Sequence, residues 1–99
     1  MEQPKYLHAE VTSRIIASAV AVHRTLGPGL LEGVVLDTAF RADLIVEGKV
    51  LVELKAVEQV IDIHKAQVLT YLRLSGIRVG LLLNFNVRRL TSGIHRFIH

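Results

Sequence analysis

Two strand-like runs at the centre of the sequence, joined by a short turn, constrain the fold more than any other feature. The runs cover residues 40–46 and 50–57, with residues 47–49 between them. A three-residue loop that contains glycine is a common hairpin connection. If Val46 pairs with Val50, one face of the hairpin is wholly apolar, whereas a shift by one residue would mix polar and apolar side chains on both faces. The apolar face therefore selects this register.

The same register gathers the charged side chains on the opposite face of the hairpin. Asp43 then faces Glu53, and Arg41 faces Lys55. Carboxylates directly opposite each other on paired strands repel. An ordinary cluster of cross-strand salt bridges on a solvated face would offset this repulsion, and the spacing alone leaves that interpretation open.

A divalent cation between the two carboxylates is the alternative interpretation. Carboxylate oxygens are the ligands that Mg²⁺ and Mn²⁺ prefer in proteins. Such an ion would lower the pKa of a bound water, and Lys55 could hold or activate that water or contact a phosphate. In this interpretation Asp43, Glu53 and Lys55 form a catalytic site that could hydrolyse a phosphodiester.

Hydrophobic periodicity and turn signals predict the elements around the hairpin. Thr12 and Asp62 are the predicted N-caps of two helices, and Gly27 and Gly76 follow the helix ends. A helix between two strands favours a mixed α/β sheet. The predicted elements are a helix over 12–26, a short strand over 34–36, a helix over 62–75, a buried strand over 78–85, and a short strand or brief helix over 94–98.

One face of the second predicted helix carries His64, Gln67 and Tyr71, at helical spacing. Glutamine and tyrosine side chains can orient a lysine, a water or a phosphate, which makes Gln67 and Tyr71 candidates for the site. An ordinary polar face with a half-buried tyrosine fits the same spacing, and a solvent-facing position is the simpler interpretation for His64. The other histidines share no spacing with ligand-type residues and are assigned no role: His8, His23, His95 and His99.

Composition excludes several classes of protein. The 99 residues leave room for one domain, over 1–99. The chain has no cysteine, so it has neither a disulfide framework nor a thiolate metal site. It has no apolar run long enough to span a membrane and no signal-peptide pattern, so we expect a soluble, cytoplasmic domain. At 51% hydrophobic residues, the chain has more apolar mass than a small domain readily hides, which favours self-association.

The distribution of charge is more informative than its sum. The formal net charge is +3, and no acidic residue follows Asp62. Such asymmetry suits contact with phosphate, although a basic surface also serves solubility alone. The candidates for contact with nucleic acid are Arg41, Arg73, Arg88 and Arg89.

Asp43 followed by Glu53-Leu54-Lys55 resembles the PD-(D/E)xK motif of nucleases. A wider set of blocks, in order along the chain, resembles the bacterial GxxExxY proteins. The step from Gln67 to Tyr71 is also similar to the motif that follows the lysine in RecB-like nucleases. The blocks shared with the GxxExxY proteins are residues 23–32, 40–44, 52–56, 66–72 and 80–86.

The resemblance implies a restriction-endonuclease-like fold, with a central mixed sheet flanked by helices. It implies that Asp43 and Glu53 bind Mg²⁺ or Mn²⁺, that Lys55 is the catalytic lysine, and that Glu32 is a further acid of the metal site. DNA is the implied partner.

The chain departs from the GxxExxY pattern after Glu32. The tyrosine of the motif is absent, and a helix and a strand are missing before residues 34–37. This deletion would uncover a sheet edge and an apolar face, so a homodimer or larger homo-oligomer is predicted. Two functions follow as hypotheses: a metal-dependent nuclease acting on DNA, or a catalytically silent dimeric nucleic-acid-binding or scaffold domain that retains the motif as a relic.

Overall fold

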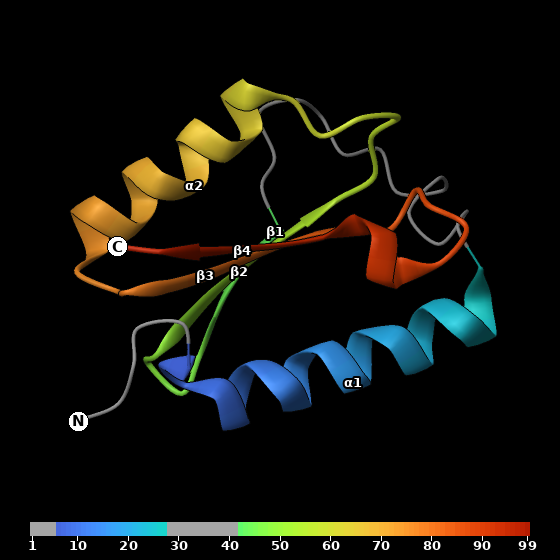
Figure 1. Ribbon diagram of the computed structural model, residues 1–99, viewed down its shortest axis with the longest axis horizontal. Helices are drawn as coiled ribbons and strands as arrows, with labels where there is room; N and C mark the ends of the chain where they lie inside the picture. Colours follow the sequence, from blue (N-terminus) through green and yellow to red (C-terminus); the bar gives the residue numbers. More distant parts are fainter. Residues whose placement is uncertain (1–5, 28–41) are drawn as a thin grey trace.

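A computed structural model describes residues 6–27 and 42–99 of the chain (Figure 1). The expected strand over 34–36 and the candidates Glu32 and Arg41 lie outside the described residues. No helix in the described part is long and apolar enough to cross a membrane. The elements are α1 (Ala9–Leu26), β1 (Ala42–Val46), β2 (Val50–Lys55), α2 (Asp62–Ser75), β3 (Val79–Asn84), the 3-10 helix η2 (Leu90–Gly93) and β4 (Ile94–Ile98).

The four strands form one mixed sheet in the order β1-β2-β3-β4. β1 and β2 are antiparallel, β2 and β3 are parallel, and β3 and β4 are antiparallel. Helix α2 connects the two parallel strands, so both of them end at the same edge of the sheet. The expected mixed α/β sheet is confirmed, and the tail over 94–98 is a strand rather than a helix.

The predicted register of the hairpin is also confirmed. Val46 pairs with Val50, and Asp43 pairs with Glu53. The turn between the strands places Glu47 and Gly48 at positive φ angles, of 55° and 65°. A glycine in the turn adopts such an angle without strain. The apolar face of the hairpin therefore predicted the strand pairing correctly.

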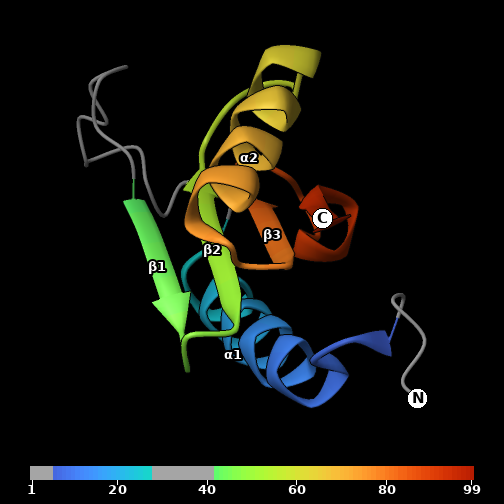
Figure 2. The same ribbon diagram turned by 90° about the vertical axis from the view of Figure 1, so that its left-hand side faces the viewer.

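The two helices cover opposite faces of the sheet, as Figure 2 shows. The face toward α1 is lined by side chains at alternating positions of β2 and β3, which is the pattern of a fully apolar core layer. Its buried members are Val11, Val50, Val52, Val79, Leu81, Leu83, Phe85 and Leu90. The face toward α2 has a smaller apolar cluster, made by Leu51, Val68, Leu72 and Leu82.

The two predicted N-caps are wrong, although α2 has its predicted bounds. Helix α1 begins at Ala9, and the hydroxyl of Thr12 donates to the carbonyl of Ala9 within the helix (3.1 Å). Helix α2 has Ile61 at its N-cap, and the Nδ1 atom of His64, the third helical residue, accepts the Ile61 N–H (3.1 Å) as in a capping box. Asp62 is therefore the first helical residue.

Candidate functional site

Two charged side chains of β2, Glu53 and Lys55, lie near the C-terminal end of the strand on the face toward α2. Glu53 is only 1% exposed, and its Oε1 atom lies 3.3 Å from the Nζ atom of Lys55. Among the described residues, neither carboxylate oxygen of Glu53 has a hydrogen-bond partner. A buried carboxylate without donors carries a large desolvation penalty, which a single ion pair offsets only in part. A second cation beside the carboxylate would therefore offset more of this desolvation penalty.

The hairpin brings a second acid to this position. Asp43 in β1 is the backbone partner of Glu53 in β2. The predicted pairing of the two acids is thus confirmed at the level of the backbone. Among the side chains that the structure describes, which do not include that of Asp43, no three of His, Asp or Glu gather into a metal site. Of the predicted metal ligands, Glu53 is the one whose side chain the structure describes.

Asn84 at the end of β3 holds the end of β2 in place. Its Oδ1 atom accepts the N–H groups of Val57 (3.1 Å) and Asn86 (3.2 Å), and its Nδ2 atom donates to the carbonyl of Val57 (2.9 Å). The N–H of Phe85 donates to the carbonyl of Lys55 (2.8 Å). The backbone on both sides of the lysine is therefore fixed against β3.

The sequence contains a signal for Asn84 that reasoning from spacing missed. The residue is a lone amide at the end of a strongly apolar strand and is 2% exposed. Buried polar side chains in proteins are nearly always hydrogen-bonded, so an amide at such a position implies a nearby backbone that needs partners.

His64 is partly exposed at the start of α2 and lies within electrostatic range of the Glu53–Lys55 pair. Burial is the main cause that lowers its pKa, and the positive charge of Lys55 adds to this effect, while the carboxylate of Glu53 opposes it. Because Nδ1 accepts a backbone hydrogen bond, the neutral ring carries its proton on Nε2. The start of α2 is thus electrostatically coupled to the charged pair.

Gln67 and Tyr71 line a shared hollow of about 210 Å³ on the surface of α2. Gln67 is half-buried, whereas Tyr71 is exposed, at 36%, and not half-buried as the ordinary polar face predicted. Their support of the lysine stays a prediction.

Comparison with known families decides the affiliation of the chain. Residues 32–97 match the family described as the PD-(D/E)XK nuclease superfamily. The chain belongs to this superfamily. No curated protein and no solved structure gives a further match. The four-stranded mixed sheet with flanking helices is consistent with a shortened form of the restriction-endonuclease-like fold.

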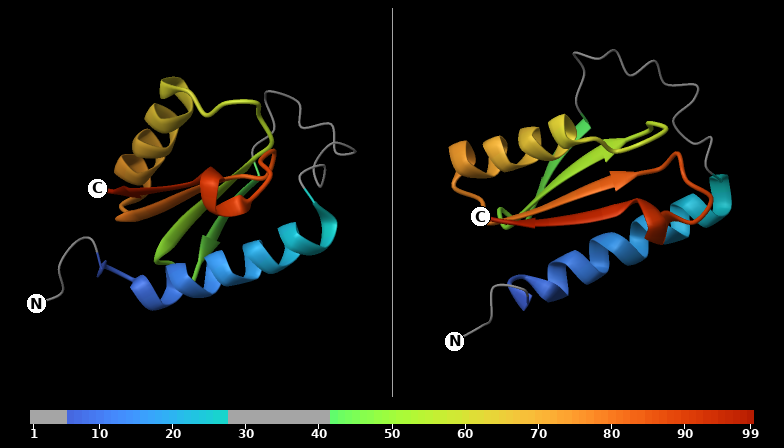
Figure 3. Two further views of the ribbon diagram at one scale, coloured as in Figure 1. Left: turned by 45° about the vertical axis from the view of Figure 1, so that its right-hand side comes forward. Right: turned by 45° about the horizontal axis from the view of Figure 1, so that its top comes forward.

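The superfamily match places the hairpin acids, the lysine and α2 inside one family domain, and such nucleases generally use divalent metal ions. The predicted phosphate contacts are spread over two regions of the domain. Arg73 is exposed in the last turn of α2, whereas Arg88 and Arg89 are exposed between β3 and η2. Figure 3 shows η2 beside the C-terminal half of α1, on the other side of the sheet from α2.

Proposed function

We propose that this protein is a divalent-metal-dependent nuclease that hydrolyses phosphodiester bonds in DNA. The observation that carries the proposal is the Glu53 carboxylate, which is buried beside Lys55 and has no hydrogen-bond donor among the described residues. A buried carboxylate of this kind is stabilised by cationic charge, and its oxygens suit Mg²⁺ or Mn²⁺. The superfamily affiliation supports the same chemistry.

Each residue has a defined role in this proposal. Glu53 and Asp43 would hold the metal ion, with Glu32 as a further acid from the segment before the hairpin. A bound ion would supply positive charge and lower the pKa of a coordinated water. The ammonium group of Lys55 would hold that water or a phosphate oxygen in position. Gln67 and Tyr71 would orient the lysine.

A cleavage assay with matched variants tests the proposal. Plasmid and single-stranded DNA are incubated with the protein and with Mg²⁺ or Mn²⁺, and Glu53→Gln and Lys55→Ala are compared with wild type. We expect cleavage to fall about 100-fold or more in both variants, since both remove charge from the reacting position. Glu58→Gln and Lys49→Gln are the controls, because each makes a similar change at an exposed position.

Direct measurement of Mn²⁺ binding by calorimetry separates this proposal from its rival. Unchanged cleavage in Glu53→Gln and Lys55→Ala would overturn the catalytic assignment. Salt-dependent DNA binding without cleavage and without Mn²⁺ binding would identify the chain as the catalytically silent binding domain instead.

We further propose that the chain is a single domain of the GxxExxY type, shortened after Glu32, that acts in the cytoplasm as a homodimer. β1 lies at an edge of the described sheet, and Leu44 on it is 54% exposed. Beside it, side chains of α1 and of the first three strands line an apolar cavity of about 290 Å³. A second copy of the chain would cover this edge and cavity. Light scattering at micromolar concentration tests this, and a monomeric mass would contradict it.

A further inference from the structure

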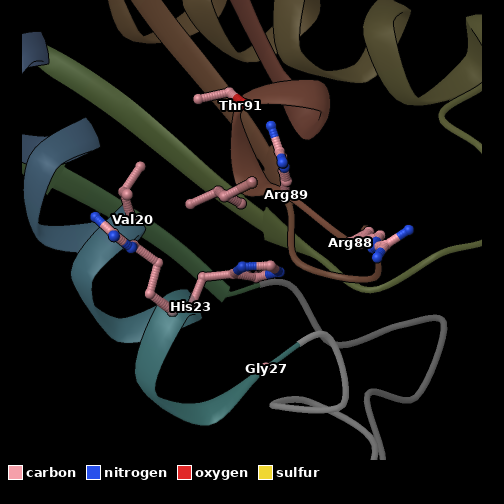
Figure 4. A pocket seen from close by; sticks show the side chains of 8 residues that line it. Val20, His23, Gly27, Arg88, Arg89 and Thr91 are labelled. Atoms are coloured by element: carbon pink, nitrogen blue, oxygen red, sulfur yellow. The ribbon is translucent and has the colours of Figure 1, made fainter.

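A second cavity, of about 560 Å³, lies between the C-terminal end of α1 and the segment that joins β3 to η2 (Figure 4). Three arginines line it. Arg24 comes from the last turn of α1, and Arg88 and Arg89 come from the joining segment. This cavity is not part of the Glu53–Lys55 site, which faces α2.

The three guanidinium groups at this cavity have no anionic partner among the described residues. The described ion pairs are Arg14 with Glu47 and Lys55 with Glu53. The joining segment also belongs to the part of the sequence that follows Asp62 and contains no acid. All three side chains are exposed, and an anion in the cavity would be attracted by their positive charges.

The backbone that carries Arg88 and Arg89 is held in place by a buried histidine. The Nε2 atom of His23 lies 2.8 Å from the carbonyl oxygen of Val87 and 3.2 Å from that of Phe85. Carbonyls only accept hydrogen bonds, so Nε2 carries a proton and donates it to them. His23 is 3% exposed, which keeps water from competing for these bonds.

The same segment is fixed at both of its ends. The side chain of Asn84 accepts the N–H of Asn86, and Leu90 is buried in the core. In Figure 4 the side chains of Arg88 and Arg89 leave this short segment in different directions. Each has a long, rotatable stem, so the guanidinium groups can turn toward a ligand while their attachment points stay fixed.

We propose that this cavity binds a phosphate group of the nucleic acid on which the Glu53–Lys55 site acts. Guanidinium groups bind phosphate through paired, charge-assisted hydrogen bonds. The joining segment begins at Phe85, whose N–H donates to the carbonyl of Lys55 (2.8 Å), so the cavity and the lysine lie at the same end of the parallel strand pair. The inference rests on the proposed function for the identity of the ligand: a phosphate inside the strand or a terminal phosphate.

Binding without cleavage tests this inference. Wild type in EDTA is titrated into a fluorescent single-stranded oligonucleotide by anisotropy, over a series of salt concentrations. We expect Arg88→Gln with Arg89→Gln to weaken binding about tenfold at low salt, the effect of removing one charge-assisted hydrogen bond. The magnitude of the slope of log K against log salt should fall by about 0.7 for each phosphate of the single strand that the variant no longer neutralises.

The matched control is Lys49→Gln with Arg78→Gln, which removes two positive charges at the opposite end of β2 and β3. We expect it to keep wild-type affinity within about twofold, as surface charges away from the ligand act only through a screened field. Thermal melting of every variant establishes that it is folded.

Binding is also measured with and without a 5′-phosphate on the oligonucleotide. If a 5′-phosphate strengthens binding and the arginine double variant abolishes that gain, the cavity binds a terminal phosphate; equal weakening with and without it indicates an internal phosphate. Equal losses in the arginine and control variants, or no binding of wild type at low salt, would overturn the inference. If wild type binds the oligonucleotide through the arginines but does not cleave DNA, the nuclease proposal alone is overturned. If wild type cleaves DNA and the arginine double variant binds as tightly as wild type, the proposal for the cavity alone is overturned.

Discussion

The two faces of the sheet are built from the same strands but differ in chemistry. The α1 face is an apolar layer in which Val52 and Leu81 are almost wholly buried. On the α2 face, at the neighbouring positions of β2, Glu53 and Lys55 replace the apolar side chains. The comparison teaches that the fold is stabilised mainly from one side. On the α2 face, Glu53 and Lys55 occupy positions at which apolar side chains would stabilise the fold more.

The largest effect expected from this difference concerns the charged pair. Lys55→Met would abolish the proposed cleavage and also lower the free energy of unfolding by about 3–5 kcal/mol, because it leaves Glu53 buried without a countercharge. Adding Glu53→Gln should restore most of that stability without restoring activity. Urea unfolding of the two single variants and the double variant measures the coupling. If the losses of unfolding free energy in the two single variants simply add in the double variant, Glu53 and Lys55 do not stabilise each other as an ion pair.

The second prediction concerns the α1 face. Leu81→Ala removes a side chain with no exposed area and should lower the free energy of unfolding by about 2–5 kcal/mol. Leu44→Ala, at a position 54% exposed, is the control and should cost less than about 1 kcal/mol in a monomer. Similar losses in both variants would show that Leu44 is covered in solution, as the proposed homodimer requires.

The third prediction concerns Asn84, which holds the chain beyond the end of β2 against the end of β3. Asn84→Ala removes the three hydrogen bonds that hold Val57 and Asn86, and should lower the free energy of unfolding by about 1–3 kcal/mol. It should also loosen the backbone near Lys55. Hydrogen exchange would show this as faster exchange of the Val57 amide, with slow exchange retained at Leu81. Uniform acceleration across β3 would instead indicate general destabilisation.

The smallest effect is a pH dependence from His64. Because the pKa of His64 is lowered in the folded protein, its neutral form is favoured there. The stability that it contributes is present above the unfolded pKa of about 6.5 and is lost as the pH falls through the folded value. Melting temperatures in EDTA between pH 7.5 and about 5 should therefore fall less in His64→Gln, whose amide oxygen can still accept the Ile61 N–H. An equal fall in melting temperature in His64→Gln and in wild type would contradict the role of His64.

Local patterns predicted much of this fold. The apolar face of the hairpin predicted the pairing of Asp43 with Glu53, and periodicity with Gly76 predicted the bounds of α2. The N-caps at Thr12 and Asp62 were wrong, because α1 begins three residues before Thr12 and α2 includes Asp62 as its first helical residue.

Long-range contacts of single polar residues were not predictable from spacing. His23 was assigned no role, because its partners at Phe85 and Val87 are distant in the sequence and are backbone carbonyls, which leave no residue-type signal. Asn84 was missed for the same reason. Of the candidate site, the acid pair and the lysine came from the pattern, whereas the residues that fix their surroundings required the structure.

The parallel pairing of β2 and β3 places the proposed nuclease site at one end of the two strands. Lys55 and Asn84 lie where both strands finish, whereas Val50 and Val79 lie where both begin, beside the exposed turn over 47–49. That turn is therefore the natural attachment point for a fluorophore, a surface tether or a fused protein. A group attached there would be held a strand's length from the proposed site, and the protein could be immobilised with its opposite end facing free solution.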